Sequence, residues 1–383
     1  MIEQTRIYLD NNATTRPYPE VIEAMSRHFE RSFANPGSRH SEGRTARKAL
    51  ERARESIADI LGAEPGEVVF TSGGTESTNM AIFGLAGRQK PGVIALTAGE
   101  HPATMESCRQ LQQLGWRLLH MDIDSNGRLI SERFSGLPWD EIKLVTVILA
   151  HNETGVVQNV APLAALCRQR GLPLHLDAVQ MVGKLPVIFR ELGATTLSLG
   201  AHKFHGPRGI GALLLREGVE LAPTLFGGHQ EAGRRPGTEP VALAAGMAKA
   251  LEIWQARKDE SIPEVTALRD RLQRGLAAKC PPAVVNGAGA HRLPNTLNIA
   301  FPGLDGEALL VALDLEGVAC SLGSTCASGS AEPAPVLVAM GCAPDVYRSS
   351  VRFSLGVDTT PDEIDDAIDR ISRVVARQRH VTG

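Results

Sequence analysis

The stretch Thr195-Thr196-Leu197-Ser198-Leu199-Gly200-Ala201-His202-Lys203 decides the fold of this chain of 383 residues. Its first five residues are typical of a buried β-strand, and the glycine that follows ends the strand. Lys203 is therefore expected just past the carboxyl end of that strand. A second apolar run, Leu174-His175-Leu176, places Asp177 in the same way. Since open α/β sheets bind ligands beyond the carboxyl ends of their strands, the two side chains are expected to share one crevice.

Lys203 and Asp177 together indicate pyridoxal phosphate as a cofactor. This cofactor needs a lysine amine to hold its aldehyde as a Schiff base and a carboxylate to keep its pyridine nitrogen protonated. Taken alone, a lysine is usually a solvated surface group. The position of both residues at strand ends favours the catalytic interpretation.

Strands and helices alternate on both sides of this stretch. Strands are predicted at 68–71, 93–97, 144–149 and 210–215, and helices are predicted to begin near residues 75, 102 and 163. This alternation is typical of a parallel sheet covered by helices. After a helix predicted at 241–257, the order changes to helix, strand, helix, strand and a final helix from Pro361 to about Ala376. We interpret this last part as a second, smaller domain.

The composition is that of a globular protein with ample cores, because 43% of the residues are hydrophobic. The net charge is −3, and the basic residues are scattered, so neither nucleic acid nor an anionic membrane is an expected partner. Residues 1–10 lack the apolar core of a signal peptide, and no apolar run approaches the ~20 residues that a membrane span needs. A cytoplasmic location is expected.

The six cysteines include no Cys-x-x-Cys pair, which argues against a disulfide framework or a zinc site. Cys108, Cys167 and Cys280 lie in helix-like patterns and are expected to be inert. Cys320 is interpreted as a packing residue at a strand end. Cys326 lies in the small, polar segment 320–330, which predicts a mobile loop with an accessible thiol that could attack sulfur. The alternative is an incidental surface cysteine.

Other polar residues follow the predicted strands. The segment 71–77 opens a helix and could bind a phosphate, although a capped helix after a tight turn is the simpler interpretation. His101 could stack on a planar ring or transfer protons, or it could be structural. Asn152 and Gln180 offer hydrogen bonds to the cofactor's phenolic oxygen or to substrate. Arg352 lies in an alternating strand and could pair with a substrate carboxylate or with a surface carboxylate.

The chain resembles the cysteine desulfurases, group I members of the class V branch of fold-type-I pyridoxal-phosphate enzymes. Motifs that resemble those of the family occur in the expected order along nearly the whole chain. They are 8–15 (YLDNNATT), 35–40 (NPGSRH), 73–77 (GGTES), 151–155 (HNETG), 177–180 (DAVQ), 202–203 (HK), 235–238 (RPGT) and 352–354 (RFS).

The resemblance implies a large α/β domain with a mainly parallel seven-stranded sheet, residues 14–258. It implies a smaller α+β domain, residues 1–13 and 259–383, that carries the catalytic cysteine loop. The implied activity is removal of sulfur from L-cysteine, which gives L-alanine and a persulfide on Cys326. A homodimer and a sulfur acceptor such as an iron-sulfur scaffold are the implied protein partners.

The resemblance also implies a role for each site residue. Lys203 would carry the Schiff base, Asp177 would bind the pyridine nitrogen and His101 would stack on the ring. Gly74, Thr75 and His202 would surround the phosphate, and Thr238 would reach the phosphate of a neighbouring subunit. Gln180 and Asn152 would bind the phenolic oxygen, while Asn152, Arg352 and Asn35 would contact the substrate.

Two residues depart from the family pattern. Gly200 and Pro236 stand where serine is common, so one hydrogen bond to the phosphate is expected to be lost at position 200. Such a bond to a charged group contributes about 1.5 to 3 kcal/mol. The alternatives for the whole chain are another class V enzyme, such as an aminotransferase or a selenocysteine lyase, and a non-catalytic scaffold of the same fold.

Overall fold

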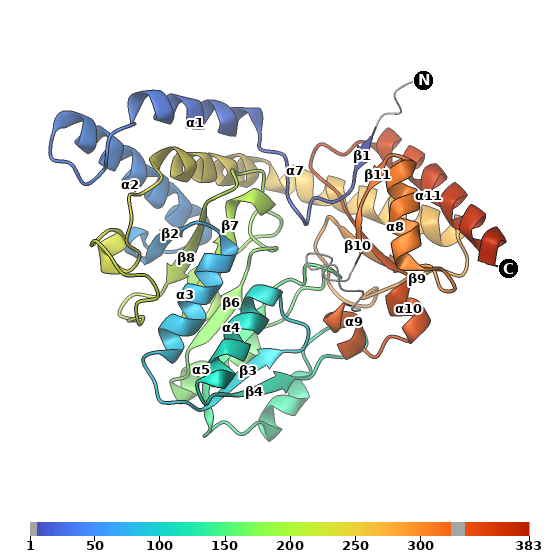
Figure 1. Cartoon of the computed structure of the whole chain (residues 1–383), viewed down its shortest axis with the longest axis horizontal. Coiled ribbons are helices and arrows are strands. Elements are labelled where there is room, and N and C mark those ends of the chain that lie inside the picture. The colour runs from blue at the N-terminus through green and yellow to red at the C-terminus, as the bar shows by residue number, and fades with distance from the viewer. Residues whose placement is uncertain (1–5, 323–333, 383) are drawn as a thin grey trace.

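A seven-stranded sheet forms the centre of the larger part of the molecule (Figure 1). The computed structural model describes residues 6–322 and 334–382. The strand order is β2 (Val68–Thr71), β8 (Gly211–Leu215), β7 (Thr196–Gly200), β6 (Leu174–Asp177), β5 (Ile142–Ile148), β3 (Val93–Thr97) and β4 (Arg117–Met121). Strand β8 is antiparallel to both of its neighbours, and the other neighbouring pairs are parallel. The predicted α/β fold with a mainly parallel sheet is confirmed.

Helices cover this sheet, which is why its inner strands are apolar throughout. Every residue of β3, β6 and β7 is buried, as expected for parallel strands with both faces covered. The covering helices are α1 (Pro19–Arg31), α2 (Ser41–Leu61), α3 (Gly74–Ala86), α4 (Pro102–Gln113), α5 (Ala161–Arg170) and the short α6 (Phe189–Leu192). Figure 1 shows α3 and α4 in front of the sheet, while α1 and α2 lie together with α7 along its upper side.

Helix α7 (Val241–Lys279) is much longer than predicted. The sequence prediction ended it at Arg257, whereas the observed helix continues past Pro263. The structure keeps a single helix because its two halves bury apolar residues in different cores. Leu251 belongs to the core of the large sheet, and Leu272 belongs to the core of the smaller part. The helix therefore links the two parts (Figure 1).

The smaller part contains a four-stranded antiparallel sheet in the order β12 (Ser321–Leu322), β13 (Ser350–Ser354), β10 (Thr296–Ala300) and β9 (Val284–Val285). A two-stranded parallel pair joins β1 (Ile7–Tyr8) to β11 (Val318–Ala319). The helices here are α8 (Gly306–Leu315), α9 (Pro335–Ala339), α10 (Pro344–Arg348) and α11 (Pro361–Thr382). Ile7 and Leu9 pack in the same core as α8 and α11. This packing supports the proposed assignment of residues 1–13 to the smaller domain.

The predicted boundaries agree closely with the observed ones near the central stretch. The predicted strands at 68–71 and 93–97 coincide with β2 and β3. Strand β4 was not predicted. It lies at the edge of the sheet, and four of its five residues are partly or fully exposed, so it lacks the apolar run of a buried strand. In the described residues, no helix combines the length and the apolar character that crossing a membrane would require.

Candidate active site

A cavity of about 600 Å³ opens at the carboxyl ends of the parallel strands. It is lined by residues that follow β2, β3, β5, β6 and β7 and by residues of the smaller part of the chain. The predicted residues that line it are Gly74, Thr75, His101, Asn152, Asp177, Gln180, His202, Lys203 and Arg352. The structure therefore brings together side chains that are separated by up to 278 positions (352 minus 74).

Lys203 ends the short 3-10 helix Ala201–Lys203 that directly follows β7. Its Nζ donates hydrogen bonds to the backbone oxygens of Asn12, at 2.7 Å, and Ala13, at 2.8 Å. Burial, together with the charge of Arg352, lowers the pKa of Lys203 to about 8. A buried amine of this kind can be neutral and nucleophilic near physiological pH.

Asp177 lies at the end of β6 and His101 follows β3, and strand β5 separates these two strands in the sheet. Asp177 is the last residue of β6, and its Oδ1 accepts a hydrogen bond from the amide of Val179 at 3.0 Å. Burial raises the pKa of Asp177, and no described basic side chain forms an ion pair with it. His101 caps α4, where its Nδ1 accepts from the amide of Ala103 at 3.1 Å. Burial lowers the pKa of His101, so this ring is neutral and carries its proton on Nε2.

Two buried groups fix the loop that carries His101. Glu100 accepts a hydrogen bond from the amide of Ile148 at 2.6 Å, and His151 Nε2 lies 2.7 Å from the oxygen of Gly99. Burial raises the pKa of Glu100 to about 8 and lowers that of His151 to about 4. Both side chains are therefore uncharged near neutral pH. The loop is held by hydrogen bonds and carries no net charge from these two groups.

The amino end of α3 lines another part of the cavity. Its first amides have no carbonyl partner within the helix and can bind an anion. A Cβ on Gly74 would lie 2.6 Å from Val179 Cγ2, so only glycine allows this close approach. A Cβ on Gly200 would lie 3.3 Å from the amide nitrogen of Gly74 and 3.7 Å from the ring of His202. Gly200 therefore lies directly beside the amino end of α3. A serine at this position would place its hydroxyl near the proposed phosphate site.

Arg352 of β13 is held by two carboxylates. Its Nη1 donates to Glu153 Oε1 at 3.0 Å, and its Nη2 donates to Asp10 Oδ1 at 2.8 Å. Burial would lower the pKa of Arg352, but Glu153 and Asp10 outweigh that effect and raise it. Glu153 also accepts from Asn152 Nδ2 at 2.6 Å, and burial raises the pKa of Glu153. A substrate carboxylate would have to share or replace one of these acidic partners.

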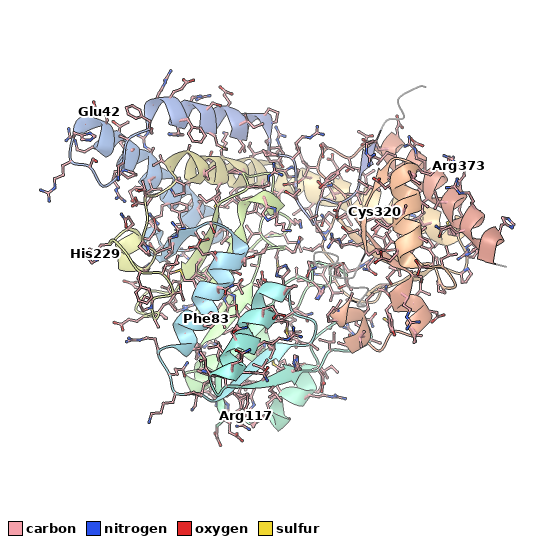
Figure 2. The ribbon with its side chains drawn as sticks, viewed as in Figure 1. Glu42, Phe83, Arg117, His229, Cys320 and Arg373 are labelled. Atoms are coloured by element: carbon pink, nitrogen blue, oxygen red, sulfur yellow. The ribbon has the colours of Figure 1, made fainter. Side chains whose placement is uncertain are left out.

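Some of the predicted residues lie elsewhere. Asn35 and Thr238 are both exposed, and neither lines the cavity. Cys326 lies outside the described residues. Cys320, which was interpreted from the sequence only as a packing residue, lines the cavity, and Figure 2 labels it in the smaller part of the molecule. Burial raises the pKa of its thiol, so it is a poor source of thiolate at neutral pH.

Asn12 belongs to the family-like motif at 8–15, and no individual role was predicted for it. Asn12 is almost completely buried, and it bonds to residues from both parts of the chain. Its side chain donates to the oxygen of Asn152 at 3.0 Å and to Thr296 Oγ1 at 2.9 Å. Its backbone oxygen accepts from Gln180 Nε2 at 2.9 Å and from Lys203. The only signal in the sequence was the motif itself.

Comparison with known proteins gives concordant matches. The family model for aminotransferase class-V matches residues 7–366. The chain is 43% identical over 375 residues to a protein of Nostoc sp. named cysteine desulfurase, covering 97% of this chain and 94% of the relative. A solved structure titled NifS-like protein matches with a TM-score of 0.91 and 33% identity, covering 97% of this chain and 100% of the other.

A third match is the solved structure titled "SspA in complex with cysteine". It has a TM-score of 0.80 and 31% identity, and the alignment covers 92% of this chain and 99% of the other. The family model spans most of this chain, and the named relative aligns with nearly all of it. The chain therefore belongs to the aminotransferase class-V family.

Proposed function

We propose that the protein is a cysteine desulfurase that uses pyridoxal phosphate to remove sulfur from L-cysteine. The single observation that carries this proposal is the convergence of the Lys203 amine and the Asp177 carboxylate in one cavity. Relatives named cysteine desulfurase, at about 43% identity over nearly the whole chain, support the same activity.

The residues of the cavity fit this cofactor. Asp177 is a buried carboxylate that forms no ion pair with any described basic side chain, so a protonated ring nitrogen would compensate its charge. The amides of Gly74 and Thr75 at the start of α3 would hold the phosphate. Neutral His101 would stack on the ring. When bound, the cofactor supplies an aldehyde that reacts with amines and a ring that accepts the electrons released at the substrate α-carbon.

The side chains of this protein would then perform the proton transfers. Lys203 is positioned to bind the aldehyde and, once displaced by substrate, to move a proton from the substrate α-carbon. The backbone oxygens of Asn12 and Ala13 are the acceptors that hold its free amine. Gln180 Nε2 and Asn152 would donate hydrogen bonds to the phenolic oxygen. Each of these groups is held by a contact within the protein, so the site is preorganised.

Sulfur transfer is assigned to Cys326. Its thiolate would attack the sulfur of L-cysteine, forming a sulfur-sulfur bond while the carbon-sulfur bond of the substrate breaks. The electron pair left on carbon takes up a proton, and the products are L-alanine and a persulfide on Cys326. Arg352 would hold the substrate carboxylate throughout. We propose that the persulfide sulfur passes to an acceptor such as an iron-sulfur scaffold.

The experiment that tests this function measures both products. Purified protein, pyridoxal phosphate and L-cysteine should give L-alanine and protein-bound persulfide in equal amounts in a single turnover. An aminotransferase would need a keto-acid acceptor and would form no persulfide. A non-catalytic scaffold would give neither product, and a selenocysteine lyase would release alanine only from selenocysteine.

We further propose a homodimer in the cytoplasm. Phe29, Phe33 and Phe226 are large apolar side chains with 62%, 74% and 85% of their surface exposed. Exposed aromatic groups of this size are typical of surfaces that bind another subunit. Thr238 is also exposed, in keeping with its proposed contact to a neighbouring subunit's phosphate. The five described cysteines are free thiols, as is usual in the reducing cytoplasm.

Cofactor uptake by the apoprotein should accelerate as the pH rises through about 8. Burial lowers the pKa of Lys203 to about 8, and only the neutral amine reacts with an aldehyde. The neutral fraction is about one tenth at pH 7 and one half at pH 8, so the rate should rise about fivefold between pH 7 and pH 8 and about twofold more before it levels off above pH 9. Stopped-flow absorbance measures this rate. A rise that continued steadily to pH 10 would indicate an ordinary lysine instead.

Replacing Gly200 by serine should tighten cofactor binding. Residue 200 has extended backbone angles that any residue can adopt, and a Cβ there would point toward the amide of Gly74. The hydroxyl could then donate to the phosphate, which is worth at least about 1.5 kcal/mol, or roughly tenfold in dissociation constant. Equilibrium titration of the apoprotein measures the change. Gly200→Ala is the control, because it adds the same Cβ without a hydroxyl and should give no gain.

A further inference from the structure

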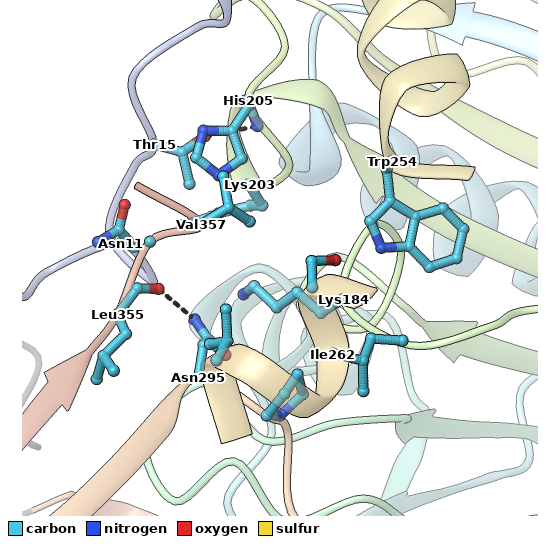
Figure 3. A pocket seen from close by; sticks show the side chains of 15 residues that line it. Asn11, Thr15, Lys184, Lys203, His205, Trp254, Ile262, Asn295, Leu355 and Val357 are labelled. Carbon is cyan, nitrogen blue, oxygen red and sulfur yellow. Dashed lines mark hydrogen bonds between the residues drawn. The ribbon is translucent and has the colours of Figure 1, made fainter. Parts of the chain in front are cut away.

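A second lysine, Lys184, lies buried beside Lys203. Only 8% of its surface is exposed, and it lies outside the large cavity. It lines a separate, small pocket of about 40 Å³ together with Lys203, Asn11 and Asn295. Figure 3 shows Lys184 extending across this pocket toward Asn295. Lys184 has no role in the proposed reaction, although it lines the same small pocket as Lys203, the proposed Schiff-base lysine.

The contacts of Lys184 are two amide oxygens. Its Nζ donates to Asn12 Oδ1 at 3.0 Å and to Gln180 Oε1 at short range. Among the described residues, no carboxylate forms an ion pair with it. Burial and the nearby charge of Lys203 lower the pKa of Lys184 well below the usual range. A neutral amine has two N–H groups, which is the number of acceptors that Lys184 contacts.

The contacts of Gln180 show which way its amide faces. The Asn12 backbone oxygen can only accept, so the Gln180 atom beside it is the amide nitrogen, and the atom beside Lys184 is the oxygen, to which the Lys184 amine donates. The amide nitrogen is then on the other side, where one of its hydrogens bonds to the Asn12 oxygen at 2.9 Å. The second hydrogen remains available to the cavity that Gln180 lines. A reversed amide would place its oxygen against the Asn12 backbone oxygen, so that two acceptors would face each other, and it would present an acceptor to the cavity.

Lys184 also fixes Asn12. The Asn12 side-chain oxygen accepts from Lys184 and from Asn295 Nδ2, at 3.1 Å, so it is anchored from both parts of the chain. The backbone oxygen of the same residue accepts from Lys203. A shift of Asn12 would therefore displace the acceptor on which the Lys203 amine rests.

We propose that Lys184 is a positioning residue, which holds Gln180 with its N–H groups toward the cavity and holds Asn12 beneath the Lys203 amine. Its catalytic consequence rests on the proposed function, while its structural consequence does not. Lys184 touches neither the large cavity nor any reacting atom, so it acts through these two neighbours.

The Lys184→Met variant tests this proposal because methionine fills similar space without a donor. A crystal structure of the variant apoprotein should show that the Gln180 side chain has turned away from the Asn12 oxygen. If Gln180 and Asn12 kept their positions to within ~0.5 Å, the proposal would be overturned. This reading does not depend on activity, so it decides the question even if the protein proved not to release alanine from L-cysteine.

Kinetics provide a second reading. Lys184→Met should lower kcat by about tenfold to a hundredfold while KM for L-cysteine stays within about twofold, because positioning of reacting groups is lost but substrate contacts remain. In a Gln180→Leu background the same change should cost less than about threefold, since the contact is already broken. Equal losses in both backgrounds would show that Lys184 does not act through Gln180.

Control variants separate positioning from general destabilisation. Lys249→Met removes a surface lysine of α7 and should leave kcat unchanged. Melting temperatures of the apoproteins report folding. If Lys184→Met does not fold, Lys184→Leu also lacks a donor, and the same structural and kinetic measurements apply to it. A folded Lys184→Leu variant with unchanged kcat and an unmoved Gln180 would also overturn the proposal.

Discussion

Lys203→Ala is expected to abolish both the covalent attachment of the cofactor and the reaction. Alanine has no amine to bind the aldehyde and none to move the proton from the substrate α-carbon. Loss of a positioned acid-base group costs up to about 10⁴-fold, and loss of the nucleophile adds to that. Alanine release should therefore fall by on the order of 10⁴-fold or more. The protein should also carry no cofactor after borohydride reduction, which mass spectrometry of the intact chain measures.

Controls make this result specific to the amine. The pocket around Lys203 depends on its bonds to the oxygens of Asn12 and Ala13, so loss of those bonds could loosen the site. Lys203→Arg retains donors for both oxygens but cannot bind the aldehyde. It should fold with a melting temperature near that of the wild type and remain inactive. Activity in either variant above about one hundredth of the wild-type rate would contradict the assignment.

Cys326→Ala is expected to block sulfur transfer while leaving the cofactor site intact. Without the nucleophile, no persulfide can form on this position, and steady-state release of alanine should fall by on the order of 10³-fold. The visible absorbance of the bound cofactor and its change on addition of L-cysteine should persist. Mass spectrometry of the chain after a single turnover detects the added sulfur. Undiminished persulfide in the variant would show that another cysteine takes the sulfur.

Cys320 provides the matched control. It is the only cysteine among the described residues that lines the cavity. Burial raises the pKa of its thiol, which keeps it protonated and a weak nucleophile at neutral pH. Cys320→Ala should therefore retain persulfide formation. If Cys320→Ala lost the persulfide while Cys326→Ala kept it, the roles of the two residues would have to be exchanged.

Prediction from the sequence succeeded best where a short apolar run ends in a polar residue. The runs that precede Asp177 and Lys203 are buried strands in the structure. They were recognisable because strands covered on both faces are apolar throughout. The catalytic candidates follow such strands directly, so their location in one cavity could be expected from the topology of a parallel sheet.

Prediction was weaker wherever a long-range contact decides the outcome. The length of α7 was underestimated because its continuation beyond Arg257 depends on packing in a second core. Cys320 was assigned to packing because nothing local shows that its strand end faces the cavity. Asn35 was predicted to contact the substrate and Thr238 to reach the phosphate of a neighbouring subunit. Within a single chain, neither residue lines the cavity.

The sequence by itself determined the alternation of buried strands and helices around the site and the residues that can carry the chemistry. These depend on local patterns of burial and on side-chain chemistry, which a linear chain already contains. Only the tertiary structure decided that Asn12 holds Lys203 across 191 positions, and that Asp10 and Glu153 hold Arg352. Such partners are selected by the packing of distant segments, and the pKa of each buried group follows from that packing.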